Sequence, residues 1–498
     1  MPASAASLPG ETIQSPPGEP ATPVARAPAF AVGDVGPNQA LFWVQGEGPG
    51  RVVVEVESDG PSAPQRLQRE LDASRDYTAK LTLNGLSPGR RQRWRAVLIG
   101  ADEQPGAITQ GSFRTAPPSS APLAVRLVFG ADLAGQNVCR DAAAGFEVFG
   151  AMAAREPELF VALGDMTYAD GLCEATGRYG NAQVPGDFGP ASDLAGFRAH
   201  WRYARADAGL RRLLASTVYL PTWDDHEVVN DVGPLHDTRA DPPYTPGEPL
   251  LPIGLAAMLE QNPIGEHPDR PGRLYRGVRW GKHLEVLLLD TRQYRDANSA
   301  VDAPERPKTM LGREQLTWLK ERLRQSDATW IIIASSVPLA IPTGAPAEGG
   351  RDGWAGFDQP TGFAQERDEI LRVAADLGRN NLVFITADVH FAAAFSHRPR
   401  ATLPSFVVHE LVAGPLSAGI GVIDDYDRGL GSARLFMHAP PTRDALRTYA
   451  DARRFFGFGE LDIADSGSLT ATLRGVDGGV LHELRLTPET ATRLATLR

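Results

Sequence analysis

Cysteine is scarce in this chain of 498 residues, which contains only Cys139 and Cys173. Two cysteines are too few for a disulfide framework or for a cysteine-based zinc site. Both lie close in sequence to the metal ligands proposed below. Three outcomes are therefore open: a single disulfide, two buried thiols, or contact with the metal site. The redox compartment stays undecided.

Long apolar runs are missing as well, so no membrane span is expected. The opening residues MPASAASLPGETIQSPPGEP have no basic start, no twin arginine and no apolar core. Neither a signal peptide nor a membrane anchor is expected from them, and the localisation stays open, with the cytoplasm as the default. The net charge is −11, without a stripe of Lys and Arg, so no sequence-specific nucleic-acid binding is expected. The oligomeric state is unknown.

The length exceeds the roughly 250–300 residues of a single core, so two or more domains are expected. Residues 1–27, rich in Pro, Ala, Ser and Gly, predict a disordered tail. Short alternating runs in 28–116 predict a small β-sandwich of the immunoglobulin or fibronectin kind. Residues 117–122 are expected to form a linker. Alternating strands and helices in 123–490 predict an α/β domain that ends in a β-hairpin made of SLTATLRG and LHELRLT.

Helical spacing of apolar residues locates several helices of the second domain. A glycine at 378 is expected to end a helix that begins near 363. The Pro- and Gly-rich stretch 231–282 is expected to be a long loop with one short helix near 255–260. The other helices are indicated by the sets Phe146, Phe149 and Ala153; Phe197, Trp201 and Ala204; and Leu316, Leu319 and Leu323.

Aspartates stand at the ends of several buried-type strands. A single such aspartate is usually a turn former or a helix cap. In an α/β sheet, however, ligands bind beyond the carboxyl ends of the strands, so these side chains should converge. Crowded carboxylates repel one another unless a cation compensates, and the set therefore predicts a metal site. Its members are Asp132, Asp165, Asp224 with Asp225, Asp290 and Asp388.

The neighbours of these aspartates add further ligand types: the phenol of Tyr168, the imidazoles of His226 and His390, and the amide of Asn230. Only these two of the ten histidines occupy such positions, which disfavours a zinc site made of imidazoles. Oxygen-rich ligation suits hard cations such as Ca²⁺, Mg²⁺, Mn²⁺ or Fe³⁺.

On these motifs the chain resembles the PhoD-like alkaline phosphatases, a branch of the calcineurin-type metallophosphoesterases. The resemblance spans residues 28–480 and rests on GDMTYAD, WDDHEVVND, LYRGVRWG, LDTRQYRD and ITADVHFAA. It implies a four-layer αββα sandwich that follows the N-terminal β-domain. It also implies Fe³⁺ and Ca²⁺ as cofactors, with Mn²⁺, Mg²⁺ or Zn²⁺ as substitutes, and a small phosphate mono- or diester as substrate. Relatives of this kind are commonly exported.

The resemblance also implies individual roles. Asp165 would bridge two metals, with Tyr168 and His390 on the first and Asp225, Asp388 and Asn230 on the second. His226 would face the substrate phosphate and its leaving group, and Arg292 would hold phosphate oxygens or brace the cluster. Where many relatives carry a cysteine, this chain has Asp132, which is expected to bind metal with weaker selectivity for iron. The superfamily's His-x-Pro ligand is replaced by Ser336-Val337-Pro338.

The expected reaction is hydrolysis of a phosphate ester by a hydroxide that two metals activate, with His226 protonating the leaving oxygen. One alternative is a phosphodiesterase specific for lipid or nucleotide diesters, which an open apolar groove beside 231–282 would favour. Another is a catalytically silent binding protein on the same fold. A dinuclear amidohydrolase is disfavoured because its His-x-His motif is absent.

Overall fold

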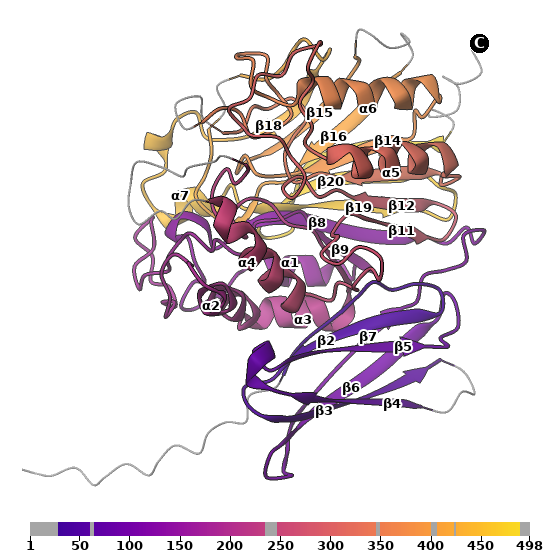
Figure 1. The fold of residues 1–498 in the computed structure, drawn as a ribbon, viewed down its shortest axis with the longest axis vertical. Coiled ribbons are helices and arrows are strands. Elements are labelled where there is room, and N and C mark those ends of the chain that lie inside the picture. The colour runs from indigo at the N-terminus through magenta and orange to yellow at the C-terminus, as the bar shows by residue number, and fades with distance from the viewer. Residues whose placement is uncertain are drawn as a thin grey trace, which may run out of the picture.

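A computed structural model of the chain describes residues 28–59, 64–234, 247–344, 349–399, 406–422 and 425–488. The predicted tail at 1–27 lies outside the described residues. Figure 1 shows a smaller β-rich part next to a larger part in which helices flank the sheets.

The N-terminal part consists of antiparallel strands in two facing layers. Its strands are β1 (Ala29–Gly33), β2 (Gln39–Gln45), β3 (Gly50–Ser58), β4 (Gln65–Leu71), β5 (Thr78–Asn84), β6 (Arg91–Gly100) and β7 (Pro105–Arg114). One layer pairs in the order β4-β3-β6-β7, and the other contains β1, β2 and β5. Phe30 and Phe42 lie in the same core as Val54 and Trp94 of the opposite layer, so the predicted sandwich is present.

The layer of β1, β2 and β5 continues a sheet of the second part. Strand β1 pairs in parallel with β10 (Val218–Pro221), with Val32 opposite Val218. Backbone pairing thus joins the two parts, in addition to the chain segment at 116–122. The domain boundary at 117–122 remains a prediction.

The second part is built on two large sheets. Besides β10, the first contains β8 (Val125–Leu133), β9 (Leu159–Ala162), β17 (Pro415–Ser417), β19 (Gly457–Ile463), β20 (Leu469–Gly475) and β21 (Val480–Leu486). Its order is β21-β20-β19-β8-β9-β10-β1-β2-β5, with β17 beside β8, and β8, β9 and β10 run parallel.

The second sheet contains β11 (Arg276–Trp280), β12 (Leu284–Leu288), β13 (Trp330–Ala334), β14 (Leu382–Thr386), β15 (Ala392–His397), β16 (Val408–Val412) and β18 (Ala433–His438). Its order is β11-β12-β13-β14-β16-β15-β18. Strands β12, β13, β14 and β16 run parallel, so their carboxyl ends lie at one edge.

These sheets pack face to face, and helices cover their outer faces (Figure 1). Phe129 of β8 shares one buried core with Val286 and Ile332 of the second sheet. The outer face of the first sheet packs against α1 (Val148–Ala154), α2 (Leu194–Arg205), α3 (Ala208–Ser216) and α4 (Gly247–Glu260). The outer face of the second packs against α5 (Gly312–Gln325) and α6 (Ala364–Asp376). The four-layer αββα sandwich is confirmed.

Most predicted helices are found, and the C-terminal hairpin is β20 with β21. Gly378 follows α6 with a φ of 67°, as a glycine after a helix often does. The prediction for 231–282 is wrong in extent, because α4 spans Gly247–Glu260 and strand β11 at Arg276–Trp280 also lies in this stretch. Residues 235–246 of the stretch lie outside the described residues. Ala257 and Met258 of α4 are buried in the helical layer, and this packing outweighs the helix-breaking tendency of Pro252. Within the described ranges, no helix combines the length and apolarity needed to cross a bilayer.

Candidate metal centre

Aspartates that follow or end β8, β9, β10 and β14 meet at one edge of the sandwich. Within the described residues, ligand atoms lie within 4.8 Å of one another in four overlapping groups, three of which share Asp165. A residue shared between neighbouring groups occupies the position that a bridging ligand needs. The three groups are Asp132, Asp165 and His390; Asp165, Asp225 and His226; and Asp165, Asp224, Asp225 and Asp388. The fourth group consists of Asp225, Asp231 and Asp352.

The backbone at this edge adopts an uncommon conformation. The φ angles of Asp132, Asp165, Asp388 and His390 are 62°, 51°, 73° and 59°. Residues other than glycine rarely enter this left-handed region, and such strain concentrates at functional sites. The chain therefore turns near the ends of β8, β9 and β14, which brings these carboxylates together instead of letting the strands continue.

The carboxylates of Asp132 and Asp165 lack the donors that buried oxygens normally have. Among the described residues, neither oxygen of Asp132 has a hydrogen-bond partner, nor does Oδ2 of Asp165. Burial, together with the neighbouring carboxylates, raises the pKa of both groups well above its ordinary value. Burial likewise raises the pKa of Asp388. A cation would satisfy these oxygens, so the donor set fits a metal cofactor.

The phenol of Tyr168 faces this group. Its hydroxyl lies 2.8 Å from Nε2 of His390, and Nδ1 of His390 is hydrogen-bonded to the carbonyl oxygen of Gly419. Nε2 of His390 also lies 3.8 Å from Oδ1 of Asp132. The Gly419 contact fixes the imidazole, as outer partners of metal-binding histidines commonly do. Burial lowers the pKa of His390 to about 4, so at neutral pH the imidazole is neutral and able to bind a cation.

Arg292 is buried beside the second group. Its Nε donates to Asp224 over 2.6 Å and its Nη1 to Asp352 over 2.9 Å, while Nη2 lies 3.7 Å from Asp225. Its side chain is fully buried. Burial alone would raise the pKa of Asp225, but Arg292 and His226 hold it below the ordinary value. The contacts of Nε and Nη1 agree with a bracing role, whereas Nη2 has no hydrogen-bond partner among the described residues, so the choice between bracing and phosphate contact remains a prediction.

The expectation that Asp290 joins the cluster is wrong. Its carboxylate accepts hydrogen bonds from Nε1 of Trp223 at 2.8 Å and from the backbone N–H of Arg292 at 3.1 Å. It is absent from the ligand groups formed by the described residues. Local donors satisfy this strand-end aspartate, so its role is structural.

His226 and Asn230 both meet Asp170, a residue to which the sequence assigns no role. Nδ1 of His226 lies 2.8 Å from Oδ1 of Asp170, whose Oδ2 accepts the backbone N–H of Asn230 at 2.9 Å. The motif GDMTYAD contains Asp170, so its carboxylate is visible in the sequence. Metal binding by the Asn230 amide remains a prediction.

Glu227 and Asp352 also hold residues of the site in place through hydrogen bonds, a role that the sequence analysis does not predict for either of them. Glu227 accepts the backbone N–H groups of Asp165, Met166 and Asp224 at 2.9, 2.8 and 2.8 Å, which ties two strand ends together. Burial raises the pKa of Glu227 to about 8 despite these donors. Glu227 could have been found from the sequence because it belongs to the acidic run WDDHE. The Gly-rich sequence around Asp352 gives no such indication.

Ser336 occupies the sequence position at which the superfamily has its histidine ligand. Its hydroxyl donates to Oδ1 of Asp224 at 2.7 Å and lies 2.6 Å from the hydroxyl of Thr291. The serine therefore orients a carboxylate beside the cluster. Burial raises the pKa of Asp224 to about 6, against the opposing effect of Arg292.

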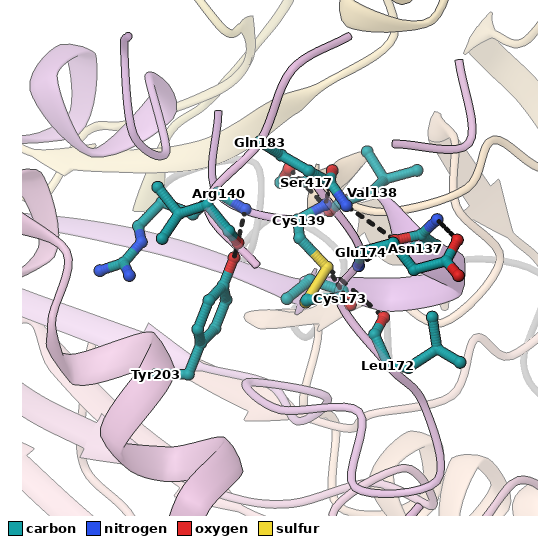
Figure 2. Close-up of a disulfide and its surroundings, with 12 residues drawn as sticks. Asn137, Val138, Cys139, Arg140, Leu172, Cys173, Glu174, Gln183, Tyr203 and Ser417 are labelled. Carbon is teal, nitrogen blue, oxygen red and sulfur yellow. Dashed lines mark hydrogen bonds between the residues drawn. A yellow bond between two sulfur atoms is a disulfide. The ribbon is translucent and has the colours of Figure 1, made fainter. Parts of the chain in front are cut away.

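Cys139 and Cys173 form a disulfide, which is one of the three outcomes left open by the sequence (Figure 2). Cys139 follows β8, and Cys173 follows the segment that contains Tyr168. The sulfur of Cys139 lies 3.6 Å from the carbonyl oxygen of Leu172. The disulfide thus joins the loop that follows Asp132 to the loop that follows Asp165, next to the candidate metal site.

Comparison with known families and proteins adds independent findings. The model of a family described as PhoD-like phosphatase matches residues 128–470. Alkaline phosphatase D of Bacillus subtilis (strain 168) is 28% identical over 259 residues. That alignment covers 48% of this chain and 42% of the relative, so the chain matches less than half of the relative's length.

Solved structures share the fold. A structure of PhoD has a TM-score of 0.69 at 19% identity and covers 94% of this chain, with 90% of its own chain matched. A purple acid phosphatase, PPD1 from yellow lupin (Lupinus luteus) seeds, has a TM-score of 0.59 at 12% identity. It covers 92% of this chain, with 74% of its own matched. At these identities the similarity establishes the fold alone.

Proposed function

Because the chain belongs to the PhoD-like phosphatase family, we propose that it is a metal-dependent phosphoric ester hydrolase acting on small phosphate mono- or diesters. The observation that supports this most directly is the position of Asp165. Its carboxylate is shared by ligand groups that contain His390 on one side and Asp225 with Asp388 on the other. The carboxylate oxygens of Asp132 and Asp165 that lack a donor among the described residues would be satisfied by a cation at the same place, which supports the proposal.

The two sides of Asp165 differ in chemistry, and this difference suggests two different metals. A phenol and an imidazole suit a transition metal, so Fe³⁺ is proposed beside Tyr168, His390 and Asp132. Oxygen ligands alone suit Ca²⁺, proposed beside Asp225, Asp388 and Asn230. Mn²⁺, Mg²⁺ or Zn²⁺ are the alternatives at either position. Once bound, such cations neutralise charge on the phosphoryl oxygens and lower the pKa of a water molecule.

His226 is the residue proposed to act on the leaving group. Asp170 holds Nδ1, so Nε2 is the nitrogen proposed to give a proton to the leaving oxygen. The imidazole also stacks on Tyr168, with ring centroids 4.1 Å apart, which fixes the plane of the donor. Arg292 keeps Asp224 in place through its ion pair.

The test combines elemental analysis with activity. Purified protein is expected to retain metal and to hydrolyse an aryl phosphate monoester, an aryl phosphodiester, or both. Asp165→Asn should abolish turnover and release metal while the fold is kept, whereas Asp187→Asn, at an exposed position, should change neither. Full metal content and full activity in Asp165→Asn would contradict the proposal. A silent binding protein would instead retain no metal in its wild-type form.

A large groove lies beside part of the stretch 231–282, where an apolar groove would favour a lipid or nucleotide diester. About 1420 Å³ in volume, it is lined by the N-terminal strands and by residues 256–279. Charged side chains contribute to its wall, among them Asp34, Lys80, Glu266 and Arg276. None of the residues that line this groove belongs to the ligand groups around Asp165, so the groove does not decide between a monoester and a lipid or nucleotide diester.

A further inference from the structure

The disulfide connects the two loops that carry ligands of the first metal position. Residues 133–139 follow Asp132 at the end of β8, and residues 166–173 follow Asp165. Figure 2 shows the bond between these segments. The backbone N–H of Leu133 also donates to the carbonyl oxygen of Asp165 at 2.7 Å. The two loops therefore contact each other twice, through this backbone hydrogen bond beside the candidate metal site and through the disulfide.

Asn137 ties the same loops through polar contacts. Its Oδ1 accepts from the backbone N–H of Glu174 at 2.9 Å and from Nε2 of Gln183 at 2.7 Å. The backbone N–H of Cys139 donates to Oε1 of Gln183 at 3.0 Å. The disulfide is thus the covalent member of a network that joins the loop after β8 to the chain around Cys173.

The loop 133–139, which follows β8, fixes the ring of Tyr168. A Cβ placed on Gly135 would lie 2.4 Å from Cζ of Tyr168, so the glycine backbone packs directly on the ring. The ring of His226 stacks on Tyr168 as well. With these contacts in place, the phenol oxygen stays 2.8 Å from Nε2 of His390. Its position therefore depends on where the loop holds Gly135.

The loop is not in a relaxed conformation. Ala134, Gln136 and Asn137 have φ angles of 69°, 51° and 57°. Non-glycine residues in this region are strained and persist only where surrounding contacts enforce the conformation. The disulfide at Cys139 is one such constraint, and the loop can relax when it is removed.

We propose that the Cys139–Cys173 disulfide is a positioning element of the metal centre: it keeps Gly135 on Tyr168, and the metal affinity of the site depends on this bond. The inference rests on the proposed metal-dependent function. It makes the disulfide part of the support of the site rather than only a general stabiliser of the fold.

The central experiment measures binding of Mn²⁺ to metal-free protein through the electron paramagnetic resonance signal of the free ion. Cys139→Ser/Cys173→Ser should bind Mn²⁺ about 10–100-fold more weakly than the wild type, as is usual when ligand support is lost. Hydrogen exchange should accelerate in 133–139 and 168–184. The matched control is Leu371→Ala in α6, which is buried in the layer outside the other sheet. It should lower the melting temperature but leave Mn²⁺ affinity unchanged.

A second variant separates positioning from the covalent bond. Gly135→Ala keeps the disulfide but places a methyl group where the Tyr168 ring lies, so it should weaken Mn²⁺ binding to a similar degree. Equal Mn²⁺ affinity in the double serine variant and in Leu371→Ala would overturn the inference. Unchanged affinity in Gly135→Ala would do the same. Failure of the proposed function would give a different result: wild-type protein with its disulfide formed and its metal bound would hydrolyse no phosphate ester.

Discussion

His226 and Asp170 form a hydrogen-bonded pair in which Nδ1 of the imidazole lies 2.8 Å from Oδ1 of the carboxylate. The other oxygen of Asp170 accepts the backbone N–H of Asn230, which fixes the carboxylate to the chain. A histidine held at one nitrogen presents the other in a defined direction. A carboxylate outside the ligand groups therefore sets the orientation of the proposed proton donor.

Replacing Asp170 tests this relationship. Asp170→Asn should lower kcat by roughly 10²–10⁴-fold for a phosphate ester with a poor leaving group, because proton donation contributes about that factor. The loss should be much smaller for a nitrophenyl ester, whose leaving oxygen needs little protonation. Steady-state kinetics on both esters measures the difference, with Asp187→Asn as the control. An equal loss on both esters would rule out a role through His226.

The buried position of Arg292 leads to a prediction about stability. Arg292→Met leaves Asp224 and Asp352 without their cation, which should reduce the free energy of unfolding by about 3–5 kcal/mol. Arg292→Lys keeps the charge but loses the paired donors, so it should lie between the wild type and Arg292→Met. Urea unfolding gives both values. A raised KM with unchanged stability would instead identify Arg292 as a phosphate ligand.

Glu227 should be sensitive to a change of a single atom. Glu227→Gln replaces one acceptor oxygen by an NH₂ group that faces a backbone N–H of Asp165, Met166 or Asp224. Leaving such a buried donor unsatisfied should cost about 1–3 kcal/mol. Thermal unfolding of metal-free protein measures the effect. Stability equal to that of the wild type would show that the glutamate does not join these strand ends.

The raised pKa values predict how pH acts on metal-free protein. A carboxyl whose pKa is higher folded than unfolded holds an extra proton in the folded state between the two values, so stability falls as pH rises across that window. For Asp224 the pKa window runs from its ordinary value of 3.8 to about 6, and for Glu227 from 4.5 to about 8. The raised pKa values of Asp132 and Asp165 act in the same direction. His390, whose pKa is lowered from 6.5 to about 4, opposes them.

Bound cations should remove most of this dependence, because they stabilise the ionised carboxylates. The melting temperature of metal-loaded protein should therefore exceed that of chelator-treated protein by a margin that widens from about pH 5 to about pH 8. Scanning fluorimetry of both forms across this range measures the margin. A constant margin would mean that the carboxylates stay ionised without metal.

Local patterns in the sequence predict much of the fold and the site. Alternating runs in 28–116 predict the N-terminal sandwich, although β4, with the largely polar sequence QRLQREL, does not follow this pattern and forms an exposed edge strand. Helical spacing locates α2 and α5, whereas the prediction for α4 is too short because Pro252 and nearby glycines suggest a loop. The aspartates at strand ends predict the candidate metal site because parallel strands end at the same edge of a sheet.

What the sequence alone determined is the set of residues with the chemistry for metal binding and the strand ends that present them. The tertiary structure alone decided their partners: Asp290 accepts a hydrogen bond from Trp223, and Arg292 is enclosed by Asp224 and by Asp352, 60 residues away. It also decided that the two cysteines pair with each other. A residue's type and spacing fix what its side chain can bind. Which partner it meets depends on segments that only folding brings together.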